Sequence, residues 1–165
     1  NGKNENGDNL PDGRFVSWLG QFQYMQKLPW KNALFVVDGM LQYAFTPLLS
    51  LEKSGLGGFS SVRGYRENVL VRDNTIRLSL EHRLPLAASR LQLVNFFDFG
   101  RGSNYHDDAP DRTIQSWGLG LRWQDVMRRY HGEIYWAEPL QNLPALEDEN
   151  SLQDKGVHFS LSASF

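Results

Sequence analysis

The chain has 165 residues, the size of one ordinary domain, and no run of about 18 apolar residues that could form a transmembrane helix. Its 17 Lys and Arg residues against 19 Asp and Glu residues give a net charge of −2, which rules out a nucleic-acid binder driven by bulk positive charge. Cys is absent, so a disulfide scaffold, a Cys-ligated zinc site and a thiol nucleophile are excluded. A transmembrane β-barrel stays possible, because alternating strands average out as polar.

Residues 1–13 consist mainly of Asn, Gly and Asp, and this composition predicts a polar external loop rather than a targeting peptide. After Gly13 the sequence falls into strand-length runs separated by turn residues. We expect residues 14–165 to form seven strands, at about 14–27, 33–46, 74–85, 91–101, 113–124, 127–138 and 156–165.

The last run, from Val157 to Phe165, shows the pattern most clearly. Apolar residues alternate with His and Ser over nine positions, which gives the strand one apolar and one polar face. The other runs put Leu, Trp, Phe and Ile on one face and Arg, Glu, Ser, Gln, Gly and Asp on the opposite face. Hydrocarbon tolerates the first face and a hydrated lumen tolerates the second.

The connections between the runs alternate in length along the chain: 28–32, 87–90 and 125–126 are short, whereas 46–73, 102–112 and 139–155 are long. Outer-membrane barrels have short periplasmic turns and long external loops. The alternation therefore favours an all-β, antiparallel transmembrane β-barrel in the bacterial outer membrane. The alternative is a soluble all-β domain, such as a lipocalin-like barrel or a sandwich, in which the apolar face would form a core.

Seven strands are an odd number, whereas single-chain bacterial barrels have an even number. An open sheet edge in lipid would leave N–H and C=O groups unsatisfied. We therefore expect these strands to be the C-terminal portion of a larger barrel. The alternative is a complete barrel of eight strands, one of which does not show the alternation of apolar and polar residues.

Three motifs follow one another in the middle of the chain. Val62-Arg63-Gly64-Tyr65 lies in the long link 46–73, Ser79–Pro85 reads S-L-E-x-R-x-P, and Phe96–Gly100 reads F-x-D-x-G. With the C-terminal Phe165, this order of features resembles the pore proteins of two-partner secretion. These form the haemolysin secretion/activation family, within the superfamily that includes outer-membrane barrel-assembly factors. The resemblance covers about residues 13–165.

The resemblance implies that the link 46–73 folds back into the barrel lumen and that Phe165 is a signal for membrane insertion. It implies an outer-membrane pore that translocates a large haemolysin- or adhesin-like partner protein. The expected partners are this unfolded client, outer-membrane lipid and the barrel-assembly machinery, with no nucleic acid. Alternatives are a barrel-assembly insertase of the same superfamily, a passive porin and a soluble ligand-binding barrel.

The residues themselves predict an anchor for that loop. Glu81 and Asp98 lie on the polar faces of neighbouring strands, so both carboxylates point into the lumen. A turn centred on residues 89–90 would place the two acids directly opposite, where like charges destabilise and need a cation. Arg63 could supply this charge with a planar fork that binds carboxylates, and Gly64 would let the backbone approach the wall. A turn centred on residues 87–88 would offset the acids by four residues, and Arg63 would reach only one.

No enzyme chemistry is predicted. The four His residues lack the spacing of metal ligands, and we expect neither a metal nor a cofactor: His82, His106, His131 and His158. The segment 58–62 lacks the second Gly of a nucleophile elbow, and no βαβ unit surrounds the Gly-rich stretch 55–58.

Overall fold

The computed structural model describes residues 13–86, 90–105, 110–125, 127, 129–141, 143 and 151–164. Phe165, His106 and the polar segment 1–12 lie outside these residues, so the predictions made for them have no structural counterpart. The described elements are β-strands and one 3-10 helix, η1 (Gln153–Lys155). The main strands are β1 (Ser17–Lys27), β2 (Leu34–Ala44), β5 (Asn74–Pro85), β6 (Leu91–Ser103), β7 (Arg112–Gln124), β8 (Tyr130–Pro139) and β9 (Val157–Ala163).

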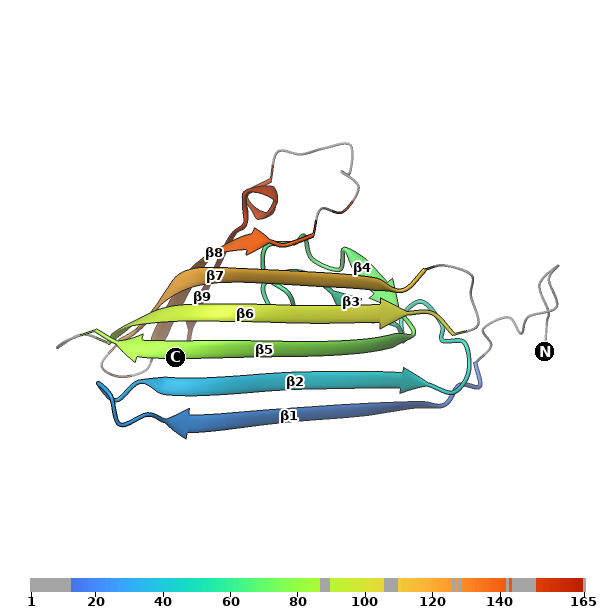
Figure 1. Ribbon diagram of the computed structural model, residues 1–165, viewed down its shortest axis with the longest axis horizontal. Helices are drawn as coiled ribbons and strands as arrows, with labels where there is room; N and C mark the ends of the chain where they lie inside the picture. Colours follow the sequence, from blue (N-terminus) through green and yellow to red (C-terminus); the bar gives the residue numbers. More distant parts are fainter. Residues whose placement is uncertain are drawn as a thin grey trace.

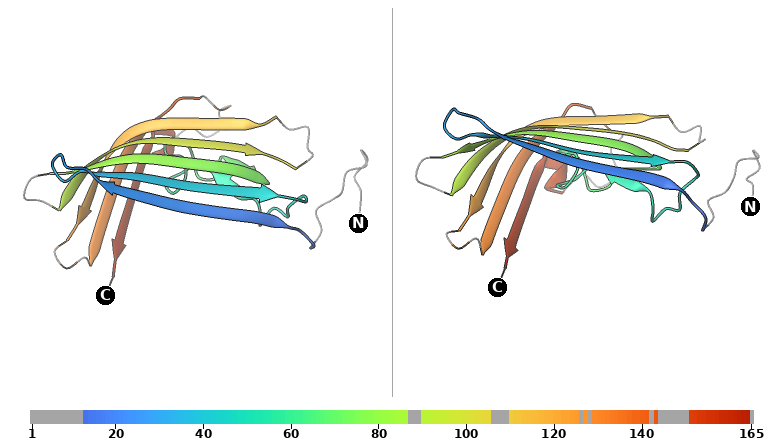
Figure 2. Two further views of the ribbon diagram at one scale, coloured as in Figure 1. Left: turned by 60° about the horizontal axis from the view of Figure 1, so that its bottom comes forward. Right: turned by 90° about the horizontal axis from the view of Figure 1, so that it is seen from below.

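These seven strands form one antiparallel sheet in the order β1-β2-β5-β6-β7-β8-β9, so neighbours in sequence are neighbours in space. The sheet is strongly curved, like a wall of an open barrel, and β8 and β9 turn away from β1 (Figure 2). Each predicted strand is present, with boundaries that differ by at most three residues. The prediction of an antiparallel β-barrel portion is confirmed.

The short connection between β1 and β2 lies at one end of the sheet and the long link between β2 and β5 at the other (Figure 1). The sequence did not predict the short strands β3 (Ser54–Leu56) and β4 (Leu70–Arg72), which form a two-stranded sheet inside the long link between β2 and β5. Figure 2 places this link on the concave side of the sheet. Three-residue strands carry too little alternation to stand out from a loop.

The convex face carries large apolar side chains that are exposed. Trp117, Leu119 and Leu161 are 44%, 43% and 77% exposed, whereas the neighbouring residues of β7 on the other face are buried. A water-soluble domain would bury these side chains, so the outward apolar face fits a wall that meets lipid. In the part of the chain that the structure describes, no helix is long and apolar enough to cross a membrane.

The packed core lies between the concave face and the long link. Leu56, Val62, Tyr65 and Leu70 of the link pack with Ile114 of β7. A second cluster joins residues of β6 and β8 with Phe59 of the link: Val94, Phe96, Tyr135 and Ala137. The concave face is therefore apolar where the link covers it, which corrects the expectation of a uniformly polar face. Apolar side chains of the link cover these residues and shield them from water.

The pairing of β5 with β6 lies between the two predicted registers. Ser79 is directly opposite Asp98, and Glu81 is opposite Phe96. Both predicted registers are wrong by two residues of pairing, in opposite directions, because the pattern of alternation fixes the face of a residue and leaves its partner open. As a result, the two carboxylates are neither opposite nor four residues apart: they are diagonal neighbours, offset by two residues.

Candidate functional site: the Arg63 anchor

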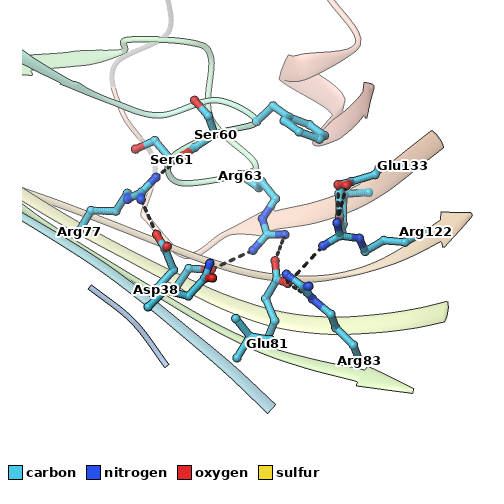
Figure 3. A pocket seen from close by; sticks show the side chains of 14 residues that line it. Asp38, Ser60, Ser61, Arg63, Arg77, Glu81, Arg83, Arg122 and Glu133 are labelled. Atoms are coloured by element: carbon cyan, nitrogen blue, oxygen red, sulfur yellow. Dashed lines mark hydrogen bonds and ion pairs between the residues drawn. The ribbon is translucent and has the colours of Figure 1, made fainter. Parts of the chain in front are cut away.

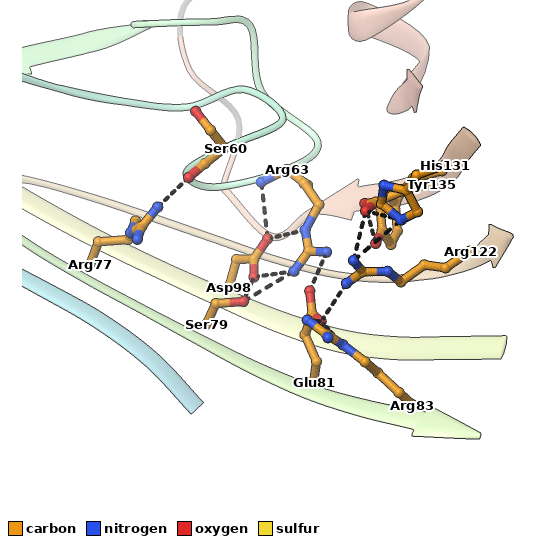
Figure 4. Close-up of polar contacts among 11 residues, drawn as sticks. Ser60, Arg63, Arg77, Ser79, Glu81, Arg83, Asp98, Arg122, His131 and Tyr135 are labelled. Atoms are coloured by element: carbon orange, nitrogen blue, oxygen red, sulfur yellow. Dashed lines mark hydrogen bonds and ion pairs between the residues drawn. The ribbon is translucent and has the colours of Figure 1, made fainter. Parts of the chain in front are cut away.

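Arg63 projects from the long link to the concave wall, where it meets both acids (Figure 4). Its Nε donates to Asp98 Oδ2 at 2.7 Å and its Nη2 donates to Asp98 Oδ1 at 2.8 Å, which is a bidentate pair. Its Nη1 donates to Glu81 Oε1 at 2.7 Å, and its backbone N–H donates to Asp98 Oδ2 at 3.1 Å. Arg63 is 5% exposed and Asp98 is fully buried. Burial opposes the charge of Arg63, but Asp98 and Glu81 outweigh it and raise the Arg63 pKa above its ordinary value.

The diagonal register explains how one guanidinium reaches both acids. Diagonal neighbours on one face of a sheet are about 7–8 Å apart, a gap that a planar fork can bridge with different nitrogens. Ser79, directly opposite Asp98, fills the remaining position: its hydroxyl donates to Asp98 Oδ1 at 2.6 Å and accepts from Arg63 Nη2 at 3.1 Å. A directly opposed pair of acids would repel each other more strongly than this arrangement.

Two aromatic rings complete the contacts of the guanidinium. The Cζ of Arg63 lies 3.6 Å from the ring centroid of Phe96 and 4.8 Å from that of Tyr135. Cation–π attraction is strongest where the cation is desolvated, as it is here. Gly118 leaves room for the Phe96 ring and Gly120 for the Tyr135 ring, since a Cβ at either position would lie within 2.5 Å of that ring.

The F-x-D-x-G motif therefore forms one continuous contact surface for the loop. Period two places Phe96, Asp98 and Gly100 on the same face, where all three are buried. Phe96 and Asp98 contact Arg63, whereas Gly100 makes room for Val62, whose Cγ2 would lie 2.9 Å from an added Cβ.

The residues after Arg63 attach the loop to β7, β8 and β9. Gly64 has a φ of +89°, which disfavours other residues, and its N–H donates to Nε2 of His158 at 2.8 Å. The Tyr65 hydroxyl lies 2.9 Å from the carbonyl oxygen of Gln115 and accepts from the N–H of Gln141 at 3.2 Å. The V-R-G-Y motif is thus in contact with every strand from β5 to β9.

The loop also binds the link between β8 and β9. Arg66 Nη2 donates to Asp154 Oδ2 at 2.8 Å, and the N–H of Glu67 donates to Gln153 Oε1 at 3.3 Å. Hydrogen bonds from Arg66 and Ser151 lower the pKa of Asp154 below its ordinary range. Two long connections that are far apart in sequence are therefore fastened to each other.

A second arginine fastens the loop from the opposite direction. Arg77 of β5 donates to the backbone carbonyl of Ser60 and to the carboxylate of Asp38 on β2 (Figure 3). Arg63 reaches from loop to wall, whereas Arg77 reaches from wall to loop. Both frame a cavity of about 210 Å3 between the loop tip and the strands.

Further charges line this cavity toward the short connections. Arg83 donates to Glu81 Oε2 at 2.7 Å, and Arg122 lies 4.0 Å from the same oxygen. Arg122 also pairs with Glu133 at 2.8 Å, which His131 contacts at 2.9 Å (Figure 4). Glu81 thus faces three guanidinium groups, while Asp98 faces that of Arg63 alone among the ion pairs between described residues.

The sequence nominated the motif residues and both acids, and the structure brings all of them together except Phe165, which lies outside the described residues. It gave no anchoring role to Ser79, Arg77 and Asp38, although their inward positions in alternating strands were readable. His158 was dismissed because it lacks ligand spacing, and its role as an acceptor for the loop needs the fold to be known.

Comparisons with known proteins agree with this architecture. The model of the haemolysin secretion/activation protein family ShlB/FhaC/HecB matches residues 1–123. Heme/hemopexin transporter protein HuxB of Haemophilus influenzae strain 86-028NP is 28% identical over 145 residues, which cover 82% of this chain and 25% of that protein. The HuxB of strain ATCC 51907 has the same identity and coverage. The solved structure of CdiB from Acinetobacter baumannii superposes with a TM-score of 0.71 and 22% identity, covering 93% of this chain and 28% of that one.

The fold and its neighbours define an outer-membrane β-barrel protein. The chain belongs to the haemolysin secretion/activation family of two-partner secretion transporters, and its place is the bacterial outer membrane. It spans about a quarter of the length of the HuxB proteins that it matches.

Proposed function

We propose that this chain is the C-terminal part of the barrel of an outer-membrane transporter that exports a large haemolysin- or adhesin-like partner protein, and that Arg63 anchors the loop 46–73 in the lumen. The observation that carries the proposal is the buried contact of Arg63 with Asp98 and Glu81. A buried guanidinium that meets two acids from two strands holds the loop at one defined position on the wall.

The position of the loop matters because it occupies the concave face. An extended client has to pass along this face if the lumen is its path, so the loop has to be placed reproducibly to leave a route. The hydrogen bonds of Gly64 and Tyr65 to β7–β9 extend the same attachment across five strands. In this proposal Phe165 directs insertion through the barrel-assembly machinery.

Replacement of Arg63 in the full-length transporter tests the proposal. We expect Arg63→Ala to reduce secretion of the client at least tenfold, while heat-modifiable gel mobility shows that the barrel still inserts. Arg63→Lys should restore only part of the secretion, because an ammonium group cannot reproduce the bidentate pair. Arg101→Ala is the matched control, since Arg101 forms an exposed pair with Asp111. Normal secretion by Arg63→Ala would refute the anchor.

A further inference from the structure

The apolar outer face of the sheet contains a polar pair. His82 of β5 is directly opposite Asn95 of β6, and both side chains point to the convex side. Along the strands, the residues two positions away on the same face are all apolar: Leu80, Leu84, Leu93 and Phe97. The pair therefore interrupts an apolar part of the outer face.

The part of the chain that the structure describes offers neither side chain a hydrogen-bond partner. Among the described residues, the His82 ring contacts only the Trp30 ring, and the Asn95 side chain makes no hydrogen bond. An amide or imidazole that meets lipid without a partner is costly. A hydrogen-bonding group of the surrounding membrane would satisfy the two side chains, which the described residues leave without such a partner.

The short connection between β1 and β2 lies beside this pair and adds an aromatic ring and a positive charge. Trp30 stacks on His82 with ring centroids 6.5 Å apart and planes 14° apart, and Nζ of Lys31 lies 5.0 Å from the Trp30 ring. Lys31 has a φ of +50°, an uncommon conformation that holds it at the turn. Within the described part of the chain, Lys31 has no acidic partner.

The level of this cluster in the membrane follows from its residues. Trp side chains concentrate where hydrocarbon meets the polar headgroups, and a Lys beside them reaches toward the headgroups. Trp30 is 58% exposed, and it stacks on His82, which belongs to the convex face. His82 and Asn95 therefore lie close to the boundary, at the depth of the phosphate and ester oxygens of a lipid.

We propose that Lys31, Trp30, His82 and Asn95 form a binding site for the phosphate-bearing headgroup of a phospholipid in the leaflet on the side of the short connections. Lys31 supplies the charge for the phosphodiester, and His82 and Asn95 donate hydrogen bonds to phosphate or ester oxygens. The Trp30 ring lies against the glycerol and the first methylene groups. The lipid atoms that would lie in this site are hydrogen-bond acceptors or apolar carbons. They match the site, because its polar side chains offer donors and Trp30 offers an apolar ring.

Native mass spectrometry of the full-length transporter, titrated with phosphatidylglycerol in detergent, tests the proposal. One basic residue near a headgroup contributes ~1 kcal/mol, so Lys31→Gln should weaken binding of the first lipid about fivefold. His82→Phe with Asn95→Leu keeps the size of the side chains and removes the donors, and it should abolish that binding step. Arg101→Gln removes a cation at the other end of the same face and should leave binding unchanged.

Two further ligands separate the possible sources of the anion. Diacylglycerol lacks the phosphate and should not fill the site, whereas equal binding of diacylglycerol would overturn phosphate recognition. Inorganic phosphate that displaces the lipid would identify the anion alone as the ligand, and failure to displace it would show that the lipid's glycerol and chains contribute. Unchanged lipid binding by the His82→Phe, Asn95→Leu variant overturns the proposal. If the transporter is instead a dimer that this double substitution dissociates, the four residues contact a second copy of the chain, and the proposal is likewise overturned.

Discussion

Asp98 and Glu81 both hold Arg63, but they stand in different surroundings. Asp98 is fully buried, and the contacts to its carboxylate described here come from Arg63 and the hydroxyl of Ser79. Glu81 faces the cavity and keeps Arg83, with Arg122 at 4.0 Å, when Arg63 is set aside. A departure of the loop would thus leave Asp98 as a buried charge without a cation, whereas Glu81 would remain paired.

This difference teaches how the attachment of the loop is distributed. Separating a buried pair is strongly unfavourable because one charge is left without compensation. Asp98 therefore resists release of the loop, while Glu81 orients the guanidinium and exchanges partners at small cost. Substitutions on the two sides should have unequal effects on the opening of the loop.

Asp98→Asn is expected to have the largest effect. It keeps the shape of the side chain and breaks the bidentate pair, which costs ~3–5 kcal/mol for a buried pair. Local opening of the loop should increase at least a hundredfold, measured by hydrogen exchange of the Arg63 and Gly64 amides in the full-length transporter. Exchange at the wild-type rate would contradict the role given to Asp98.

Gly100→Ala is expected to have the next largest effect, because its Cβ would lie 2.9 Å from Val62 Cγ2 in a packed core. Overpacking of this kind costs ~1–3 kcal/mol and should loosen the loop by about tenfold in the same exchange experiment. Gly132→Ala is the control, since nothing lies closer than 3.7 Å to its Cβ. Equal exchange in both variants would show that Val62 has no fixed position.

Glu81→Gln should open the loop less than either change, because the Arg63 guanidinium keeps both of its hydrogen bonds to Asp98 and the amide oxygen still accepts one from Arg63. We expect an increase in exchange of severalfold at most. An effect of Glu81→Gln that equals that of Asp98→Asn would remove the distinction between the two acids.

The smallest effect concerns the outer tether of the loop at Asp154. The pKa of this carboxyl is lowered in the folded protein by Arg66, so the tether stabilises the fold at pH values above the ordinary carboxyl pKa of 3.8. It weakens only as the pH falls through the lowered value. Asp154→Asn should accordingly remove a small, salt-sensitive contribution at pH 7, seen as faster exchange of the Glu67 amide, and should match the wild type in strong acid.

Much of the architecture was readable because alternation reports directly on the environment of a strand. Val157 to Ala163 and Ile76 to Leu84 have period-two patterns, and both form strands whose apolar side is at least partly exposed. The pattern could not fix the register of β5 against β6, because shifting a pair by two residues keeps every side chain on its face. The diagonal placement of Glu81 and Asp98 depended on that register.

The sequence by itself determined the strands, their faces and the candidate anchor, because these depend on residues close together in the chain or on a motif order. Only the tertiary structure decided that His158 accepts from Gly64, that Arg77 fastens Ser60, and that Trp30 stacks on His82. Each of these contacts joins different strands or connections. Their geometry follows from how the sheet curves and where the long link packs, and no local pattern encodes that.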